Sequence, residues 1–311
     1  MKKEKIPFFL KKNKKFKEHL DKFYLTKLSG KDSKLISKFY KSAPFPNYQE
    51  LETLSDLNLK LKENPVLKNL KDSIGFKKNI LEVGSGTSQL SIMFAYQTNN
   101  QVVAMDATFE SLKLGHSFAE KNNLNNCNFL RADIFDDPIN DSVFDIIWCN
   151  GVLHHTKDPE KAFEIISNWL KPGGIIIIGL YNKFGRVRTN IRQIIYKLVG
   201  PILGKKFLYY FDPYLRKEIS QEKINAWIND QYSNPIESSH TFDELIKWFE
   251  NNGINFLRSI PSADLSNINY SNVLDKRSTG NYFTRLIAQV NMIFSSYGSE
   301  GGLFIMFGKK N

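Results

Sequence analysis

Cysteine is scarce in this chain, which has only Cys127 and Cys149 among its 311 residues. The two residues do not have the spacing of a metal site or of a disulfide framework, so neither is expected. Both fall in apolar stretches with the pattern of buried strands. A reducing, cytoplasmic setting is therefore expected.

Long apolar runs are also missing. No unbroken apolar stretch approaches the roughly 20 residues that a membrane-spanning helix needs. The N-terminus is rich in lysine but lacks an apolar segment followed by a small-residue cleavage site, so no secretory signal is expected. The sequence shows no internal repeat.

The net charge of the chain is +11, and two segments with few acidic residues account for its positive sign. Residues 1–31 hold eleven lysines and three acids, a local charge of +8, and residues 183–206 hold seven basic residues and no acid. The rest of the chain is left with a net charge of −4. The basic character therefore belongs to two attachments and not to the middle of the chain.

That middle part contains a glycine-rich turn between an expected strand and an expected helix. Residues 80–83 have the pattern of a buried strand, and Gly84 and Gly86 allow a tight turn and close approach to a ligand. The helix expected from about Ser88 would direct its N-terminal amides at that ligand. The motif predicts a nucleotide-binding loop, although a structural turn of any α/β protein could have the same residues.

Acidic and polar residues follow the next expected strands. Residues 102–105 lead to Asp106, 22 positions after Gly84, and a carboxylate at this offset accepts hydrogen bonds from ribose hydroxyls. Asp133 and Asn150 follow two further strands. Additional strands are expected at 127–130, 144–149 and 175–180, with helical segments between them. This alternation predicts a parallel sheet whose ligand binds at the carboxyl ends of the strands.

Together these motifs resemble the class I S-adenosylmethionine-dependent methyltransferases of the broad small-molecule type, with a more distant similarity to quinone-precursor methyltransferases. The matching stretches follow the family's order and are Leu81 to Thr87, Asp106, Ala132 to Ile134, Asn150 to His155 and Leu170 to Gly174. The resemblance covers roughly residues 60–182. It implies an α/β fold with a Rossmann-like doubly wound sheet, mostly parallel with an antiparallel final strand, and S-adenosylmethionine as the cofactor.

The resemblance also implies which residues bind the cofactor. They are Glu82, Gly84, Ser85, Gly86, Asp106, Ala107, Asp133, Ile134, Asn150 and Leu153. The loop from Glu82 to Gly86 would surround the methionine part, Asp106 would bind the ribose, and Asp133 with its neighbour would hold the adenine. Asn150 and Leu153 would line the methyl-transfer end.

Two positions of the loop depart from related patterns. The family often has a third glycine where this chain has Ser88. Serine is small and a good helix N-cap, so we expect it to preserve the loop. The dinucleotide fingerprint would need glycine in place of Gln89, which favours S-adenosylmethionine over NAD.

Methyl transfer requires mainly in-line alignment of donor and acceptor, and a hydroxyl acceptor would also benefit from a general base. The candidate bases are His154, His155 and His240, with Tyr181 and Tyr232 as positioning groups. Each histidine also has a structural interpretation: one of the adjacent pair as a hydrogen-bonding residue of its turn, and His240 as the residue before a helix cap. A thiolate, carboxylate, amine or carbanion acceptor would need no base.

The chain is expected to divide into four parts. These are a basic helical N-terminal arm (1–60), the cofactor-binding core (61–182), a basic amphipathic insertion (183–240) and a C-terminal completion of the sheet (241–311) that contains an insertion (262–300) shaping the pocket. In the last part, Thr241 and Glu244 form a capping box ahead of a helix. Strands are expected at 254–260 and 302–308, and the resemblance implies that these two pair antiparallel.

Both basic segments leave alternatives open. Residues 1–31 are either a solvated helix or a lid or docking arm. The aromatic, proline-containing stretch 39–48 either packs on the core or forms a wall of the pocket. Residues 191–203 form an apolar stripe at helical spacing, and Pro201 is expected to kink or end the helix near Gly200. The segment 186–206 is either an ordinary cover, a basic cover that attracts an anionic substrate, or an interfacial helix that contacts anionic lipid at the membrane periphery.

The leading functional hypothesis is a methyltransferase for a small-molecule acceptor with an O, N, S or C nucleophile, an anionic or lipid-like acceptor being left open. An RNA methyltransferase is the alternative that the basic segments suggest, but no RNA-binding module and no Asn/Asp-Pro-Pro-Tyr motif is present, which disfavours nucleic acid as the partner. A non-catalytic S-adenosylmethionine-binding protein is the third hypothesis. The sequence does not predict an oligomeric state.

Overall fold

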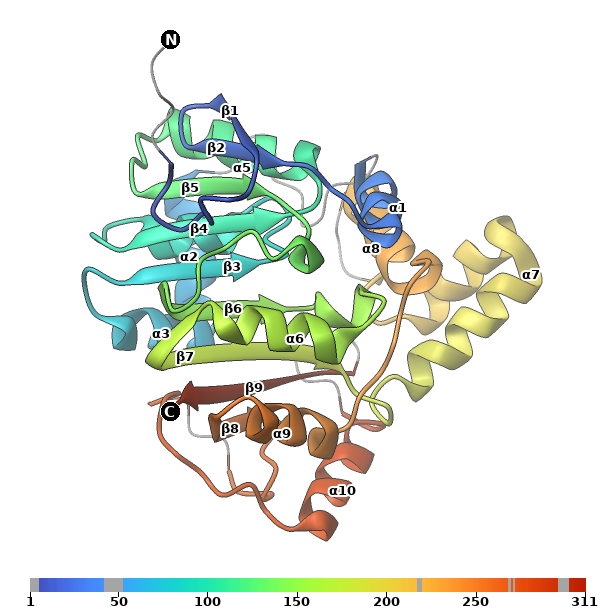
Figure 1. The fold of residues 1–311 in the computed structure, drawn as a ribbon. Coiled ribbons are helices and arrows are strands. Elements are labelled where there is room, and N and C mark those ends of the chain that lie inside the picture. The colour runs from blue at the N-terminus through green and yellow to red at the C-terminus, as the bar shows by residue number, and fades with distance from the viewer. Residues whose placement is uncertain (1–5, 42–52, 217–219, 268–269, 271, 296–301) are drawn as a thin grey trace.

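A single twisted sheet organises the molecule, with helices on both of its faces (Figure 1). The structure is a computed structural model that describes residues 6–41, 53–216, 220–267, 270, 272–295 and 302–311. Within these residues the sheet has nine strands in the order β1-β2-β5-β4-β3-β6-β7-β9-β8. The strands are β1 (Phe16–Leu20), β2 (Phe23–Thr26), β3 (Asn79–Val83), β4 (Gln101–Asp106), β5 (Cys127–Arg131), β6 (Phe144–Asn150), β7 (Leu170–Tyr181), β8 (Ile254–Ile260) and β9 (Leu303–Lys310).

Helices connect and cover these strands. They are α1 (Lys31–Lys41), α2 (Leu54–Glu63), α3 (Pro65–Ile74), α4 (Gln89–Ala95), α5 (Phe109–Lys121), α6 (Pro159–Asn168), α7 (Val187–Phe211), α8 (Gln221–Ser233), α9 (Phe242–Asn251) and α10 (Tyr282–Asn291), with the short 3-10 helices η1 (Ile134–Asp136) and η2 (Leu153–His155). Helices α6, α9 and α10 supply buried residues to one face of the sheet, and α2 to α5 supply them to the other. The layers are therefore those of an α/β sandwich.

The parallel core is doubly wound around β3. From β3 the chain adds β4 and β5 on one side and β6 and β7 on the other, and all of these pairs are parallel. The order reverses between β3 and β6, where a crevice forms at the carboxyl ends of the strands. The sheet ends as expected, because β9 lies antiparallel to both β7 and β8.

The N-terminal segment differs from the expected helical arm. Phe16–Thr26 folds into the antiparallel pair β1 and β2, and β2 adds to the sheet parallel to β5. Phe23 is fully buried and stacks on the rings of Phe109 and His116. An open edge at β5 would leave its backbone groups without partners, and β2 supplies them. The helical expectation is thus wrong for residues 16–26, and within the described residues up to 60 it holds for α1 and the start of α2.

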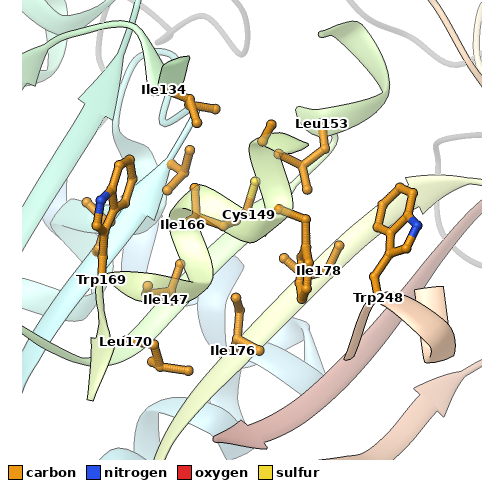
Figure 2. Packing of buried hydrophobic residues seen from close by; sticks show 14 of the residues in the cluster. Ile134, Ile147, Cys149, Leu153, Ile166, Trp169, Leu170, Ile176, Ile178 and Trp248 are labelled. Carbon is orange, nitrogen blue, oxygen red and sulfur yellow. The ribbon is translucent and has the colours of Figure 1, made fainter. Parts of the chain in front are cut away.

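The apolar core surrounds the middle strands. Figure 2 shows Ile147 and Cys149 of β6 and Ile176 and Ile178 of β7 beneath the side chain of Leu153. Both cysteines lie in buried strands, as expected, and burial raises the pKa of each thiol, so both remain uncharged at neutral pH.

Local signals set the ends of two further helices. Thr241 and Glu244 form the expected capping box at the start of α9. Gly200 has a φ of 77°, so α7 is two helical segments joined at a kink directly before Pro201, as expected.

Across the described residues, no helix combines the length and the apolarity needed to span a membrane.

Candidate active site

A cavity of about 540 Å³ opens at the carboxyl ends of the parallel strands. The last residues of β3, β4, β6 and β7 all line it, as do Ala132 to Ile134 directly after β5. Helices α1 and α8 contribute further lining residues, Asp32, Ser33, Ile36 and Tyr40 from the first and Ala226 and Asp230 from the second. Its size is typical of small-molecule sites, and its position is the switch point of the sheet.

The glycine turn after β3 forms the floor of this cavity. Gly84 has a φ of 68° and Gly86 a φ of 51°, both in the left-handed region that side chains rarely adopt. A Cβ atom on Gly84 would lie 2.2 Å from Cγ2 of Val152. Glycine is therefore required at position 84 by conformation and by space.

Ser88 preserves this loop by a route other than the expected one. It is the N-cap residue of α4, but its side chain makes no capping hydrogen bond, and its φ is 64°. Its hydroxyl lies 3.2 Å from the hydroxyl of Ser85 instead. A Cβ on Gly115 would lie 2.8 Å from Cβ of Ser88, so close packing at this point depends on a glycine of α5. The expected capping role is wrong because the left-handed backbone replaces the extended conformation of a side-chain cap.

Asp106 connects the end of β4 to the glycine turn. Its Oδ2 accepts a hydrogen bond from the Gly86 N–H at 2.8 Å, and its Oδ1 accepts one from the Thr108 N–H at 2.7 Å. Burial raises the pKa of this carboxyl, and the backbone donors act against that shift. The carboxylate lines the cavity, as expected for a ribose-binding group.

Glu82 is the second buried carboxylate of the cavity. Its Oε2 accepts a hydrogen bond from the Ser91 N–H of α4 at 2.8 Å. Burial raises the pKa of Glu82 to about 7, the hydrogen bonds from Ser91 oppose this shift, and the charge of Asp106 adds to it. A charged partner in the cavity would therefore change its protonation near neutral pH.

Asp133 joins the cavity to the segment before α1. Its Oδ2 accepts a hydrogen bond from the Gly30 N–H at 3.2 Å, and its Oδ1 accepts one from the Phe135 N–H at 3.0 Å. A Cβ on Gly30 would lie 2.5 Å from Oδ2 of Asp133. Ile134 lines the cavity beside it.

Asn150 and Leu153 were both expected at the methyl-transfer end, and only Asn150 lines the cavity. Its Oδ1 is buried and has no hydrogen-bond partner among the described residues. Leu153 is fully buried in the core, where Figure 2 shows it above Cys149. The turn before η2 presents Val152 to the cavity instead, so the expectation for Leu153 is wrong.

A hydrogen-bonded network lines the cavity where α1 meets α8. The hydroxyl of Tyr40 donates to Oδ1 of Asp230 at 2.5 Å and accepts from Nδ2 of Asn234 at 3.1 Å. Nε2 of Gln231 donates to Oδ2 of Asp230 and to the hydroxyl of Tyr181, both at 2.8 Å. The expected positioning residue Tyr181 is therefore at the cavity, held by residues of α8.

Arg186 supports this network from behind. The guanidinium lies 3.8 Å from the centre of the Tyr181 ring and donates to Oε1 of Gln231 at 2.6 Å. It also donates to both carboxylate oxygens of Glu237 at 2.8 Å. This cation of the second basic segment is thus fully buried and neutralised within the protein.

The adjacent histidines have different surroundings. His155 lines the cavity, and its Nδ1 lies 2.7 Å from the carbonyl oxygen of Ile236. Because a carbonyl can only accept, Nδ1 carries the proton and Nε2 is the basic nitrogen of the neutral ring. His154 is fully buried, stacks on Tyr181 at 3.8 Å and accepts from the Tyr181 N–H. Burial holds the pKa of His154 well below its usual value.

Two other candidate residues are not among those that line the cavity. His240 lies between Ser238 and Glu244, and burial lowers its pKa against the opposing effect of Glu244. The hydroxyl of Tyr232 donates to Oδ2 of Asp212 at 2.8 Å and accepts from Arg192 at 3.0 Å. This geometry assigns both residues to packing between helices and loops, so the expectation that they face the acceptor is corrected.

The lining residues that the structure describes carry an excess of negative charge. The acids are Asp32, Glu82, Asp106, Asp133 and Asp230, and the bases are Lys60 and Lys157. None of the basic residues of 183–206 is among these described lining residues. A cationic ligand is therefore better matched to the cavity than an anionic one.

Sequence reasoning missed Tyr40 and Asp230 as a pair, since 190 positions separate them and no spacing rule connects them. The aromatic stretch 39–48 does reach the cavity through Tyr40, whereas residues 42–48 lie outside the described part of the chain. Among its described residues, the basic segment 1–31 contacts the site through Gly30, which donates to Asp133.

The domain is a Rossmann-like nucleotide-binding domain. It has a doubly wound sheet, a glycine turn after β3, and acidic residues after the strands β4 and β5. The chain belongs to the methyltransferase domain family, whose model matches residues 75–231, about half of its length. This confirms the expected family, the class I S-adenosylmethionine-dependent methyltransferases, and with it the expected cofactor.

Individual relatives are distant. A Synechococcus protein of uncharacterized function is 24% identical over 58% of this chain and 48% of its own length. A ubiquinone biosynthesis O-methyltransferase of Coxiella burnetii is 30% identical over 44% of this chain and 56% of its own length. The chain thus spans about half the length of these curated relatives.

Among solved structures, PKMT2 from Rickettsia typhi in complex with AdoHcy is similar, with a TM-score of 0.56 and 17% identity. The match covers 78% of this chain and 52% of that one. At this identity the likeness concerns the fold, and it agrees with the expected fold class.

Proposed function

We propose that this protein transfers a methyl group from S-adenosylmethionine to a small-molecule acceptor. The observation that carries the proposal is that the glycine turn, Glu82 and Asp106 line the same cavity as Tyr40 and Asp230. The residues at the ends of β3 and β4 have the features of a nucleotide site, and those where α1 meets α8 offer hydrogen-bonding groups suited to a second ligand. Two ligands in one enclosed space is the arrangement that in-line transfer requires.

The residues present fit this cofactor. The left-handed glycine turn can approach it closely, the carboxylates of Asp106 and Asp133 can accept hydrogen bonds from its hydroxyl and amino groups, and Oδ1 of Asn150 is buried without a partner among the described residues. The negative lining also suits its positive charge. The bound cofactor supplies the methyl group on an activated sulfonium.

We assign the acceptor to the part of the cavity lined by Tyr40, Asp230, Tyr181 and His155. Asp230 can accept a hydrogen bond from an acceptor hydroxyl or amine, and Tyr181 is fixed by Gln231 and Arg186 to form the wall. His155 would accept the proton from a hydroxyl acceptor at Nε2, since Nδ1 is engaged by Ile236. The acidic lining favours a neutral or cationic acceptor group over an anionic one.

The acceptor can be identified by incubating the protein with methyl-labelled S-adenosylmethionine and a metabolite extract, followed by mass spectrometry of labelled products. Asp106→Asn is the negative control. It is expected to weaken S-adenosylhomocysteine binding by about tenfold or more, because a charged hydrogen-bond acceptor is lost. Glu120→Gln, an exposed acid of α5, is the control that should retain activity.

The outcomes separate the remaining hypotheses. Labelled small molecules that depend on Asp106 would support the proposal. Cofactor binding without S-adenosylhomocysteine production in any extract would instead favour a non-catalytic binding protein. Label found only in RNA would replace the small-molecule acceptor by a nucleic acid.

A further inference from the structure

Helix α7 carries an apolar surface that faces away from the described part of the protein. In its first half the exposed residues Val187, Ile191, Ile194 and Leu198 recur at i, i+4, i+7 and i+11, which places them on one side of the helix. After the kink, Ile202, Leu203, Tyr209 and Tyr210 are among the exposed residues. We call these eight residues the α7 apolar surface. Leu198 is 80% exposed and Ile202 77%.

The opposite side of α7 is already occupied by the protein. Leu208 is fully buried in a small core with Trp227 and Tyr232, and Tyr196 packs against that core. Arg192 donates a hydrogen bond to the hydroxyl of Tyr232 at 3.0 Å. The helix is therefore held in place by one side while the apolar surface is displayed on the other, and Figure 1 shows α7 (yellow) projecting from the body.

Positive charge lies beside the first half of the α7 apolar surface and within its second half. No acid occurs between residues 183 and 211, and Arg188, Lys197, Lys205 and Lys206 lie on α7 itself. By helical periodicity, Arg188 and Lys197 lie on the two sides of the first apolar stripe. An apolar face bordered by basic residues, with tyrosines beside it, is typical of helices that lie in the interface of an anionic membrane.

We propose that α7 docks this protein on an anionic lipid surface by inserting the α7 apolar surface. Charge complementarity favours anionic lipid as the partner of this surface. An apolar protein surface would have no use for the four basic residues on α7. The proposal stands independently of the methyl-transfer reaction. If that reaction holds, docking also places the cavity near the bilayer, since α8 packs on α7 and its Ala226 and Asp230 line the cavity.

Vesicle flotation tests this docking directly, with phosphatidylcholine vesicles that contain or lack phosphatidylglycerol. The protein should float with the anionic vesicles and detach as salt is raised. Leu198→Glu/Ile202→Glu should lower the partition coefficient by about tenfold or more, because two charges replace the most exposed apolar side chains. The matched control is Leu59→Glu/Phe76→Glu, which changes residues that are 56% and 74% exposed on other elements and should float normally.

The basic residues are tested separately. Lys205→Gln/Lys206→Gln should weaken binding to anionic vesicles several-fold, whereas Lys62→Gln/Lys113→Gln, at exposed positions of α2 and α5, should not. Circular dichroism establishes that each variant folds. Absence of flotation, or equal binding to neutral vesicles at all salt concentrations, overturns the proposal. So does a dimer in light scattering that Leu198→Glu/Ile202→Glu dissociates, because a second copy would then occupy this surface.

Discussion

The hydroxyl of Tyr40 donates a hydrogen bond of 2.5 Å to Oδ1 of Asp230, joining α1 to α8 across the cavity. Burial, and then the charge of Asp230, raise the pKa of Tyr40 well above its usual value, so its phenol stays protonated at neutral pH. Tyr40 therefore acts as a hydrogen-bond donor to Asp230 and not as a base. Helix α1 is therefore a wall of the cavity.

Tyr40→Phe should weaken both this wall and acceptor binding. The change leaves Asp230 and Asn234 with one hydrogen bond fewer each, at an expected cost of about 1 to 3 kcal/mol in the free energy of unfolding. We expect a rise in KM for the acceptor with little change in the affinity for S-adenosylhomocysteine, measured by steady-state kinetics and calorimetry. Tyr282→Phe, on the exposed side of α10, is the control. Wild-type stability and KM in Tyr40→Phe would show that the pair does not shape the acceptor site.

His155→Asn tests whether Nε2 of His155 accepts the acceptor proton. The asparagine amide can still donate to Ile236, so the fold should be retained, while the basic nitrogen is lost. For a hydroxyl acceptor we expect kcat to fall by about a hundredfold. The variant should also lose the rise of kcat with pH that a general base produces. His240→Asn, outside the described lining residues, should retain that pH profile. An unchanged profile in His155→Asn would remove the residue from the reaction.

The sequence predicted those parts of the structure that have local signals. The five parallel strands follow from their apolar runs, α9 from the Thr241–Glu244 capping box, and the α7 kink from Gly200 and Pro201. The edge strands β1 and β2 were missed, because their phenylalanines also fit a helical spacing and only the open edge of β5 decides between the two. Contacts across the cavity have no local pattern at all.

Phe23→Ala should show that the N-terminal segment belongs to the sheet. Phe23 is fully buried between Phe109, His116 and Phe129, so its truncation leaves a cavity and should cost about 3 to 5 kcal/mol in the free energy of unfolding. Phe76→Ala, at a side chain that is 74% exposed, should cost less than about 1 kcal/mol. Urea unfolding of both variants gives the comparison. A deletion of residues 1–31 would remove β2 altogether. A loss of activity in that deletion would therefore not show by itself that the segment is a lid.

Glu82 gives the ligand-free protein a specific dependence on pH. Its pKa is raised from 4.5 to about 7 in the folded state, so the folded protein holds this proton more tightly than the unfolded chain. Stability is therefore unaffected below about pH 4.5, is lost as the pH rises towards 7, and stays lower by a constant amount above it. The shift corresponds to about 3 kcal/mol.

Glu82→Gln removes this titration while it keeps an oxygen that can accept from Ser91. Its free energy of unfolding should exceed that of the natural protein by up to about 3 kcal/mol at pH 8, and the difference should vanish towards pH 4.5. Glu120→Gln, at an exposed site, should show no such trend. Urea unfolding from pH 5 to 8 without cofactor measures the difference at each pH. A constant difference would mean that Glu82 is ionised throughout, and its role would then be a fixed negative charge facing the cofactor.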